Sequence, residues 1–169
     1  MYKHLKTKLL AILLVICLPL YALAIEVYFS PQGGTQKRII ELINDAKKSI
    51  DIAVYGFTAP EIAEALVKAH KRGVQIRIVL DRTQAAGRES QSGYLQEQLN
   101  VRIAHQKGIM HNKIGIIDKA ILITGSYNWT KSAEDNNAEN CLVITNEDDP
   151  DVIQQYRERF EYIWQLNEP

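Results

Sequence analysis

The stretch SIDIAVYGFTAPEIAEALVKAHKRGVQIRIVL, residues 49–80, decides the fold class. Residues 49–57 are apolar and β-branched, which is typical of a buried strand, and residues 74–80 form a second run of the same kind. Between the two runs, apolar residues recur at helical spacing, with Thr58 as the expected N-terminal cap and Gly73 as the residue that ends the helix. A strand, a helix and a strand in this order predict parallel pairing through a crossover helix.

The pattern extends in both directions along the chain. Residues 25–30 predict a strand that belongs to the same parallel set, and Thr35 is placed to cap a helix running to about Lys48. Downstream, we expect a polar loop, a short helix, two short strands joined at Asp118–Lys119, another strand and a last helix, over residues 81–93, 93–100, 112–117, 120–124, 140–145 and 148–165. The predicted class is α/β, with a mixed β-sheet flanked by helices on both faces.

The composition excludes several classes of protein. The 169 residues include 20 basic and 20 acidic side chains, and 46% are hydrophobic, which is too apolar for a disordered chain. The net charge of zero hides an asymmetry, because residues 68–131 carry +7 and residues 132–169 carry −8. A basic segment attracts phosphates, so a neutral total does not exclude nucleic acid as a partner. The alternative is that these charges pair across the fold.

Residues 1–24 have the organisation of a secretory signal peptide. Three lysines precede the apolar run of residues 9–18, and Ala-Leu-Ala follows at residues 22–24. We expect cleavage to leave residues 25–169 as a single domain in the periplasm or outside the cell, without stable membrane association. The alternative is an uncleaved membrane anchor, although residues 9–24 fall short of the roughly 20 residues that span a bilayer.

The chemically informative segments are HNKIGIID, residues 111–118, and GSYN, residues 125–128. His111 and Lys113 are two residues apart where a predicted strand begins, and in an extended chain such side chains point to the same face. An imidazole beside an ammonium would be costly in a core, because burial disfavours both charges. Around an anion the pair is useful, since Lys113 could hold a phosphate that a neutral His111 attacks.

Ser126 and Asn128 repeat this spacing and offer a hydroxyl and an amide to the same phosphate, while Gly125 allows close approach of the backbone. Taken singly, each residue has an ordinary structural explanation, but the joint pattern is rare by chance. His105 and His111 lack a nearby cluster of carboxylates or thiols, so we expect no metal site and no cofactor.

Together these residues resemble the HKD motif of the phospholipase D superfamily. The similarity rests on six residues and continues at residues 137–140, 28–31 and 52–55; the six are His111, Lys113, Asp118, Gly125, Ser126 and Asn128. It spans essentially all of the chain after residue 24 and points to the small, single-motif Nuc-type bacterial endonucleases. It implies the fold of that family, a phospholipase D/nuclease-like mixed sheet.

The resemblance also implies a mechanism. His111 would form a covalent phosphohistidine, and Lys113, Ser126 and Asn128 would hold the phosphate oxygens. Glu139 would accept a hydrogen bond from the other ring nitrogen of His111.

Asp118, a member of the motif and a candidate catalytic residue, would orient the strand or turn that carries the lysine. A single histidine cannot be nucleophile and general acid at once. A homodimer that brings two copies of His111 together is therefore expected, with no metal required.

The function predicted from the sequence is a metal-independent phosphodiesterase, a non-specific endonuclease acting on DNA or also on RNA. One alternative is a phospholipase D-type hydrolase of phospholipids, which would need an exposed apolar rim that the sequence after residue 24 does not display. The other alternative is a phosphate-binding relative without catalysis.

Overall fold

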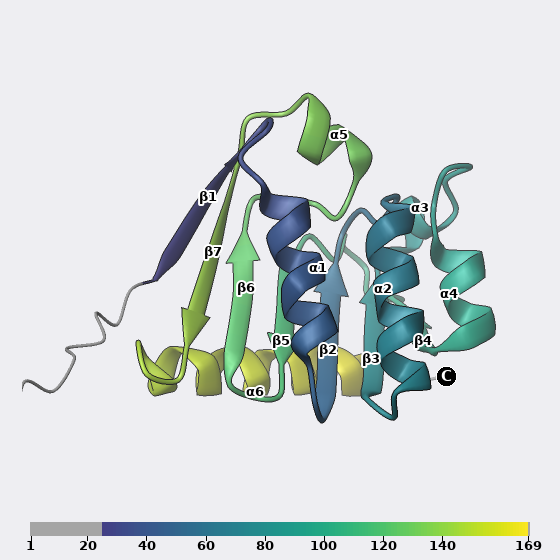
Figure 1. Ribbon diagram of the computed structural model, residues 1–169. Helices are drawn as coiled ribbons and strands as arrows, with labels where there is room; N and C mark the ends of the chain where they lie inside the picture. Colours follow the sequence, from purple (N-terminus) through teal and green to yellow (C-terminus); the bar gives the residue numbers. More distant parts are fainter. Residues whose placement is uncertain (1–24, 169) are drawn as a thin grey trace, which may run out of the picture.

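The computed structural model describes residues 25–168, so the expected signal peptide at residues 1–24 lies outside the described residues (Figure 1). A seven-stranded sheet runs through the molecule in the order β1-β7-β6-β5-β2-β3-β4. The strands are β1 (Glu26–Ser30), β2 (Ser49–Val54), β3 (Gln75–Leu80), β4 (Asn100–Ile103), β5 (Lys113–Ile117), β6 (Ile121–Gly125) and β7 (Glu139–Thr145).

Helices cover both faces of this sheet (Figure 1). They are α1 (Thr35–Asp45), α2 (Pro60–Lys71), α3 (Arg82–Ala85), α4 (Ser92–Gln98), α5 (Lys131–Asp135) and α6 (Pro150–Leu166). The short elements α3, β4 and α5 were not predicted, because four or five residues are too few to show the periodic spacing of apolar residues that identifies a helix or strand. Within residues 25–168, no helix is both long and apolar enough to cross a bilayer.

The sheet consists of two halves that meet between β2 and β5. Strands β2, β3 and β4 are parallel, and α2 connects β2 to β3 as predicted. Strands β5, β6, β7 and β1 are antiparallel to their neighbours. The expectation that residues 25–30 join the parallel set is wrong, because β1 pairs with β7 at the far edge, Glu26 opposite Val143.

Two hydrophobic cores confirm the α/β class with helices on both faces. On one face, α1 and α2 bury Ile43 and Leu66 against the sheet. On the other, α6 buries Phe160 and Trp164. The guanidinium of Arg77 on β3 lies 4.9 Å from the centre of the Phe160 ring and pairs with acidic side chains of β2 and α6, which fixes this helix across the lower part of the sheet.

Two of the predicted helix ends differ from the structure. The residue that caps α2 is Ala59 and not Thr58, and no side chain bonds to this end. Thr35 is buried as the first residue of α1, whose cap is Gly34 at φ 79°. Gly73 does end α2, with φ 96° and its N–H donating to the oxygen of His70 at 2.8 Å.

Candidate active site

The predicted site residues meet where several strands end at the upper edge of the sheet in Figure 1. Lys113 begins β5 opposite Val54, at the carboxyl end of β2. A cavity of about 440 Å³ opens there, lined by His111, Lys113, Gly125, Ser126, Asn128 and Glu139. The structure therefore brings together every candidate site residue except Asp118.

Lys113 provides a positive charge in the wall of this cavity. Its side chain is only 8% exposed, and its Nζ donates to the backbone oxygen of His111 at 3.0 Å. The same nitrogen lies 5.1 Å from the centre of the Tyr55 ring. Burial lowers the pKa of Lys113, while the negative charge of Glu139 acts in the opposite direction.

His111 is exposed, and its ring contacts that of Tyr55 edge to face, with 4.5 Å between the ring centres. The expected hydrogen bond between Glu139 and this imidazole is absent from the described part of the chain. The oxygens of Glu139 accept instead from Ser126 Oγ at 2.6 Å and from Asn137 Nδ2 at 3.1 Å.

Ser126 and Asn128 differ in their readiness to bind an anion. The hydroxyl of Ser126 donates to Glu139 and accepts from the N–H of Asn140, so its proton is already committed. Asn128 Oδ1 accepts from the N–H of Gly56 at 3.2 Å. Since a backbone N–H can only donate, the amide oxygen must face it, which leaves the NH₂ group of Asn128 available as a donor.

The residue between them anchors this segment. Tyr127 is 2% exposed, and its hydroxyl donates to Glu134 at 2.7 Å. Burial is the main cause that raises the pKa of Tyr127, with the hydrogen bond to Glu134 adding to it. Tyr127 points into the core, whereas its two neighbours line the cavity.

Gly125 is required by the backbone at the end of β6. It has φ 146°, and a Cβ there would lie 2.3 Å from the backbone oxygen of Asn140. This close approach holds β6 against the start of β7 beside the cavity, whereas the approach of the Gly125 backbone to a phosphate stays a prediction.

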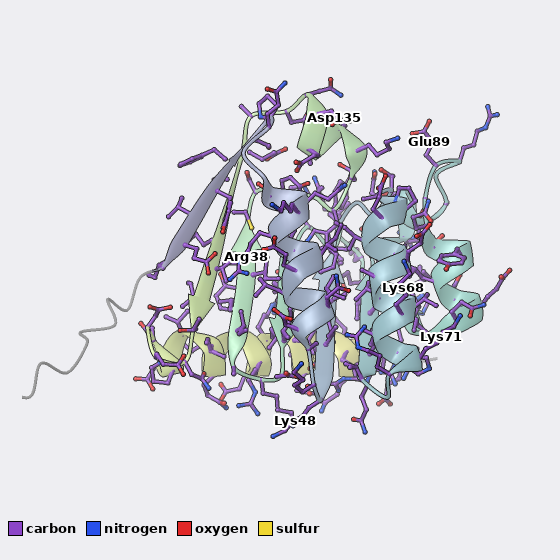
Figure 2. All side chains as sticks on the ribbon, viewed as in Figure 1. Arg38, Lys48, Lys68, Lys71, Glu89 and Asp135 are labelled. Carbon is purple, nitrogen blue, oxygen red and sulfur yellow. The ribbon has the colours of Figure 1, made fainter. Side chains whose placement is uncertain are left out.

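Asp118 lies at the opposite end of β5, five residues or about 17 Å from Lys113 along the strand. Its carboxylate accepts the N–H groups of Lys47, Lys48 and Ser49 at 2.6–3.0 Å. Figure 2 shows Lys48 at the lower edge of the sheet and Asp135 at the upper edge. This placement corrects the inclusion of Asp118 among the candidate catalytic residues, because its carboxylate fixes the connection between α1 and β2.

The basic segment of residues 68–131 does not form one surface. Lys68 and Lys71 lie on α2, over the face of the sheet (Figure 2). Arg77 pairs with Asp51, whose hydrogen bond is the main cause that raises the pKa of the guanidinium. The basic side chains carried by elements at the upper edge are those of Arg82, Arg88, Lys107, Lys113 and Lys131, and acidic side chains such as Asp135 and Glu139 lie at the same edge (Figure 2).

Two residues beside the site were missed by sequence reasoning. Tyr55 follows β2 directly, and Asp81 follows β3 directly. Side chains that come just after parallel strands gather at one edge of a sheet, where α/β folds place their ligand sites. That position was the signal that could have identified both. Within residues 25–168, no group of three or more His, Cys, Asp or Glu side chains is arranged to hold a metal ion.

Comparison with known proteins connects this geometry to a family. The family described as "Cardiolipin synthase, PLD-like domain" matches residues 39–164. Human mitochondrial cardiolipin hydrolase is 38% identical over 141 residues, which are 82% of this chain and 55% of the relative. Phospholipase D of Rickettsia prowazekii is 43% identical over 117 residues, 69% of this chain and 57% of the relative. The chain thus spans little more than half the length of these curated relatives.

Among solved structures, a phospholipase D family member, Nuc from Salmonella typhimurium, superposes with a TM-score of 0.79 at 35% identity, covering 86% of this chain and 96% of Nuc. NucT from Helicobacter pylori gives a TM-score of 0.71 at 27% identity, covering 85% of this chain and 98% of NucT. The resemblance inferred from the sequence is confirmed: the chain belongs to the phospholipase D superfamily.

Proposed function

We propose that this protein is a metal-independent phosphodiesterase that cleaves nucleic acid through a phosphohistidine on His111. The observation that carries the proposal is the convergence of His111 with a buried lysine and an amide donor around one cavity. A nucleophile next to fixed cationic and amide donors is what phosphoryl transfer needs, because the developing charge is spread over the phosphate oxygens.

In the proposed reaction, a ring nitrogen of His111 attacks phosphorus, and the bond from phosphorus to the leaving oxygen breaks. Lys113 and Asn128 hold the non-bridging oxygens. The leaving oxygen takes a proton from His111 of a second copy of the chain, and this second imidazole then removes a proton from the water that hydrolyses the phosphohistidine.

The uncovered part of the sheet supports such a homodimer. Val27 and Phe29 of β1 alternate with Tyr28, which packs against the core under α1 and α2, so they point to the face that α6 crosses. They are 51% and 64% exposed. Val27 lies opposite Leu142 of β7, so the apolar surface continues inward from the edge strand. An exposed apolar sheet face of this kind is suited to self-association about a two-fold axis.

Nucleic acid is favoured as the substrate by the charges at the site edge. Lys107 lies in the loop between β4 and β5 that also carries His111, and Arg88 lies in the loop between α3 and α4. Cations in this position bind a phosphate backbone without reading bases, which predicts weak sequence preference. The likeness to Nuc over 96% of its length agrees with this substrate class.

Hydrolysis of a phospholipid is the second candidate. Two relatives are named mitochondrial cardiolipin hydrolase and phospholipase D, and Ile109, two residues before His111, is 57% exposed. The rim of the site therefore includes an exposed apolar side chain, which the sequence alone did not indicate.

One experiment separates the two candidates. The purified protein is incubated in excess EDTA with plasmid DNA, and in parallel with vesicles of cardiolipin and of phosphatidylcholine. Nicking of the plasmid is the expected result, and headgroup release without nicking would refute the nuclease proposal. His111→Asn should lower the rate by about 10⁴-fold or more, whereas His105→Asn should cleave like the unmodified protein.

A further inference from the structure

Within residues 25–168, the imidazole of His111 makes no hydrogen bond, so its orientation depends on other contacts. The imidazole is exposed, and the aromatic ring that it contacts is that of Tyr55. A nucleophile must be held close to its line of attack, because a small displacement costs much of the rate. The surroundings of His111 therefore contain groups whose role is to position it.

Tyr55 acts on His111 in two ways. Its backbone N–H donates to the oxygen of Asn112 at 2.9 Å, which fixes the main chain just after the histidine. Its ring meets the imidazole edge to face, at 4.5 Å between centres and an interplanar angle of 61°. Such contacts have a preferred geometry, so the phenol ring restricts rotation of the imidazole.

Asp81 fixes the main chain on the other side of the histidine. Its Oδ2 accepts the N–H of Met110 at 2.9 Å, and both residues are almost completely buried, at 2% and 0% exposed. A carboxylate that accepts a backbone N–H in a buried place forms a strong, directional bond. The residue before His111 is thus held by β3, and the residue after it by β2.

The same two residues are linked to each other through α3. Asp81 Oδ1 accepts the N–H groups of Thr83 at 2.9 Å and of Gln84 at 3.2 Å, which caps this short helix. Gln84 Nε2 then donates to the hydroxyl of Tyr55 at 3.1 Å. One buried carboxylate therefore holds the backbone at Met110 and, through Gln84, the ring that contacts His111.

We infer that Tyr55 and Asp81 are positioning residues that orient His111 for attack, from the ends of the two parallel strands next to the site. The inference rests on the proposed function of His111 as a nucleophile. Neither residue needs to touch the substrate, so their loss should lower kcat and leave KM unchanged.

The test compares four variants of the full chain. Tyr55→Leu removes the ring and should lower kcat by about 10²-fold with KM unchanged. Tyr55→Phe keeps the ring and removes only the bond from Gln84, so it should retain activity to within about fivefold. Asp81→Asn should lower kcat as Tyr55→Leu does. Tyr94→Leu, which removes an exposed aromatic ring on α4, is the matched control and should leave kcat and KM unchanged.

A second readout does not depend on catalysis. The ring protons of His111, assigned by their disappearance in His111→Asn, should be shifted in the NMR spectrum by the ring current of Tyr55. The shift should disappear in Tyr55→Leu and persist in Tyr55→Phe and Tyr94→Leu. This measurement also keeps the inference testable if Asp81→Asn does not fold.

The outcomes for the two proposals are distinguishable. If the unmodified protein cleaves its substrate while Tyr55→Leu shows the same kcat and the same His111 resonances, the positioning role is refuted and the proposed function stands. If the unmodified protein cleaves no phosphodiester but its His111 resonances respond to Tyr55 as described, the proposed function fails and the structural coupling is upheld.

Discussion

Lys113 donates a hydrogen bond from its Nζ to the backbone oxygen of His111, at 3.0 Å. One of the three N–H donors of the lysine therefore tethers it to the residue that we propose as the nucleophile, and two remain for a phosphate. Because the ammonium is aimed by the main chain at residue 111, the charge and the imidazole keep a fixed spacing. The pKa of Lys113 is then a measure of the charges around the proposed active site.

Glu139→Gln should lower the pKa of Lys113 further. Burial already lowers this pKa, and the carboxylate of Glu139 is the charge that opposes burial. With the carboxylate removed, Lys113 should lose its proton at a lower pH, and phosphate binding should fail at a correspondingly lower pH. The Cε carbon shift of Lys113 followed against pH checks this. Glu147→Gln, on an exposed loop, is the control, and an unchanged or higher pKa in Glu139→Gln would contradict the prediction.

Gly125→Ala should destabilise the fold by about 3 kcal/mol. The added Cβ would lie 2.3 Å from the oxygen of Asn140, at a φ of 146° that side chains rarely adopt. The change in unfolding free energy is measured by urea titration. Gly93→Ala is the matched control, because it lies in α4 with no atom within 4 Å of the new Cβ. The control should be neutral or stabilising, by up to about 1 kcal/mol; equal destabilisation of both variants would argue against the steric explanation.

Asp118→Asn should destabilise the protein at neutral pH by about 1–2 kcal/mol. Burial acts to raise the pKa of Asp118, but the N–H donors of Ser49, Lys47 and Lys48 outweigh it, so the pKa lies below its usual value. A lowered carboxyl pKa stabilises the fold above the unfolded-state value and loses this contribution as pH falls through the folded-state value.

The difference in stability between Asp118→Asn and the unmodified protein should therefore shrink as the solution is acidified below about pH 4. Thermal unfolding at a series of pH values measures it. Asp135→Asn, an exposed substitution on α5, provides the comparison and should show little difference at any pH. Activity per folded molecule should be retained in Asp118→Asn, and its loss would return Asp118 to the catalytic residues.

Substituting Arg88 and Lys107 by Gln should weaken DNA binding and reduce its salt dependence. Each phosphate that is no longer neutralised lowers the slope of log K against log[salt] by about 0.9, so the slope of the double variant should fall by about 2 per chain. Affinity is measured by fluorescence anisotropy over a range of salt concentrations. The double variant of Lys68 and Lys71, which lie on α2 away from the upper edge, has the same charge and should bind like the unmodified protein (Figure 2). If DNA binding were weakened equally in the two double variants, the total charge of the protein and not the position of these side chains would determine its affinity.

Phe29→Asp should convert the proposed dimer to a monomer. The side chain is 64% exposed on the sheet face left open by α6, and a charge there would be desolvated in the interface. Light scattering measures the mass, and activity should fall together with the dimer fraction because the second His111 is then absent. Tyr162→Asp, which places a charge at a 56% exposed aromatic residue of α6, should stay dimeric and active. A fully active monomer would defeat the shared-site proposal.

Much of the site could be predicted because its chemistry is local in sequence. His111 and Lys113 lie two residues apart, as do Ser126 and Asn128, and both pairs line the same cavity. The same strand geometry should have excluded Asp118, since five residues of extended chain place it at the other end of β5.

The remaining differences arise from tertiary contacts. The sequence of residues 26–30 predicts a strand but does not indicate its neighbour. A strand of this kind forms the same backbone hydrogen bonds with β7 as it would with β2. The family resemblance pairs Glu139 with His111, but in the structure its oxygens accept from Ser126 and Asn137, which are contacts that the sequence alone does not indicate. The fold also separates the basic residues of the +7 segment, residues 68–131. Arg77 is neutralised by Asp51 within the sheet, whereas Lys107 lies in the loop between β4 and β5 at the upper edge.

The pairing of β1 with β7 has a consequence for biosynthesis. The first described strand pairs with the last described strand, Glu26 opposite Val143, so the sheet can close only after β7 has left the ribosome. Glu139 and the strand that supports Gly125 also emerge late. A nascent chain that ends before residue 139 therefore has His111 and Lys113 but lacks Glu139, and the phosphate pocket is assembled only after β7 has been made.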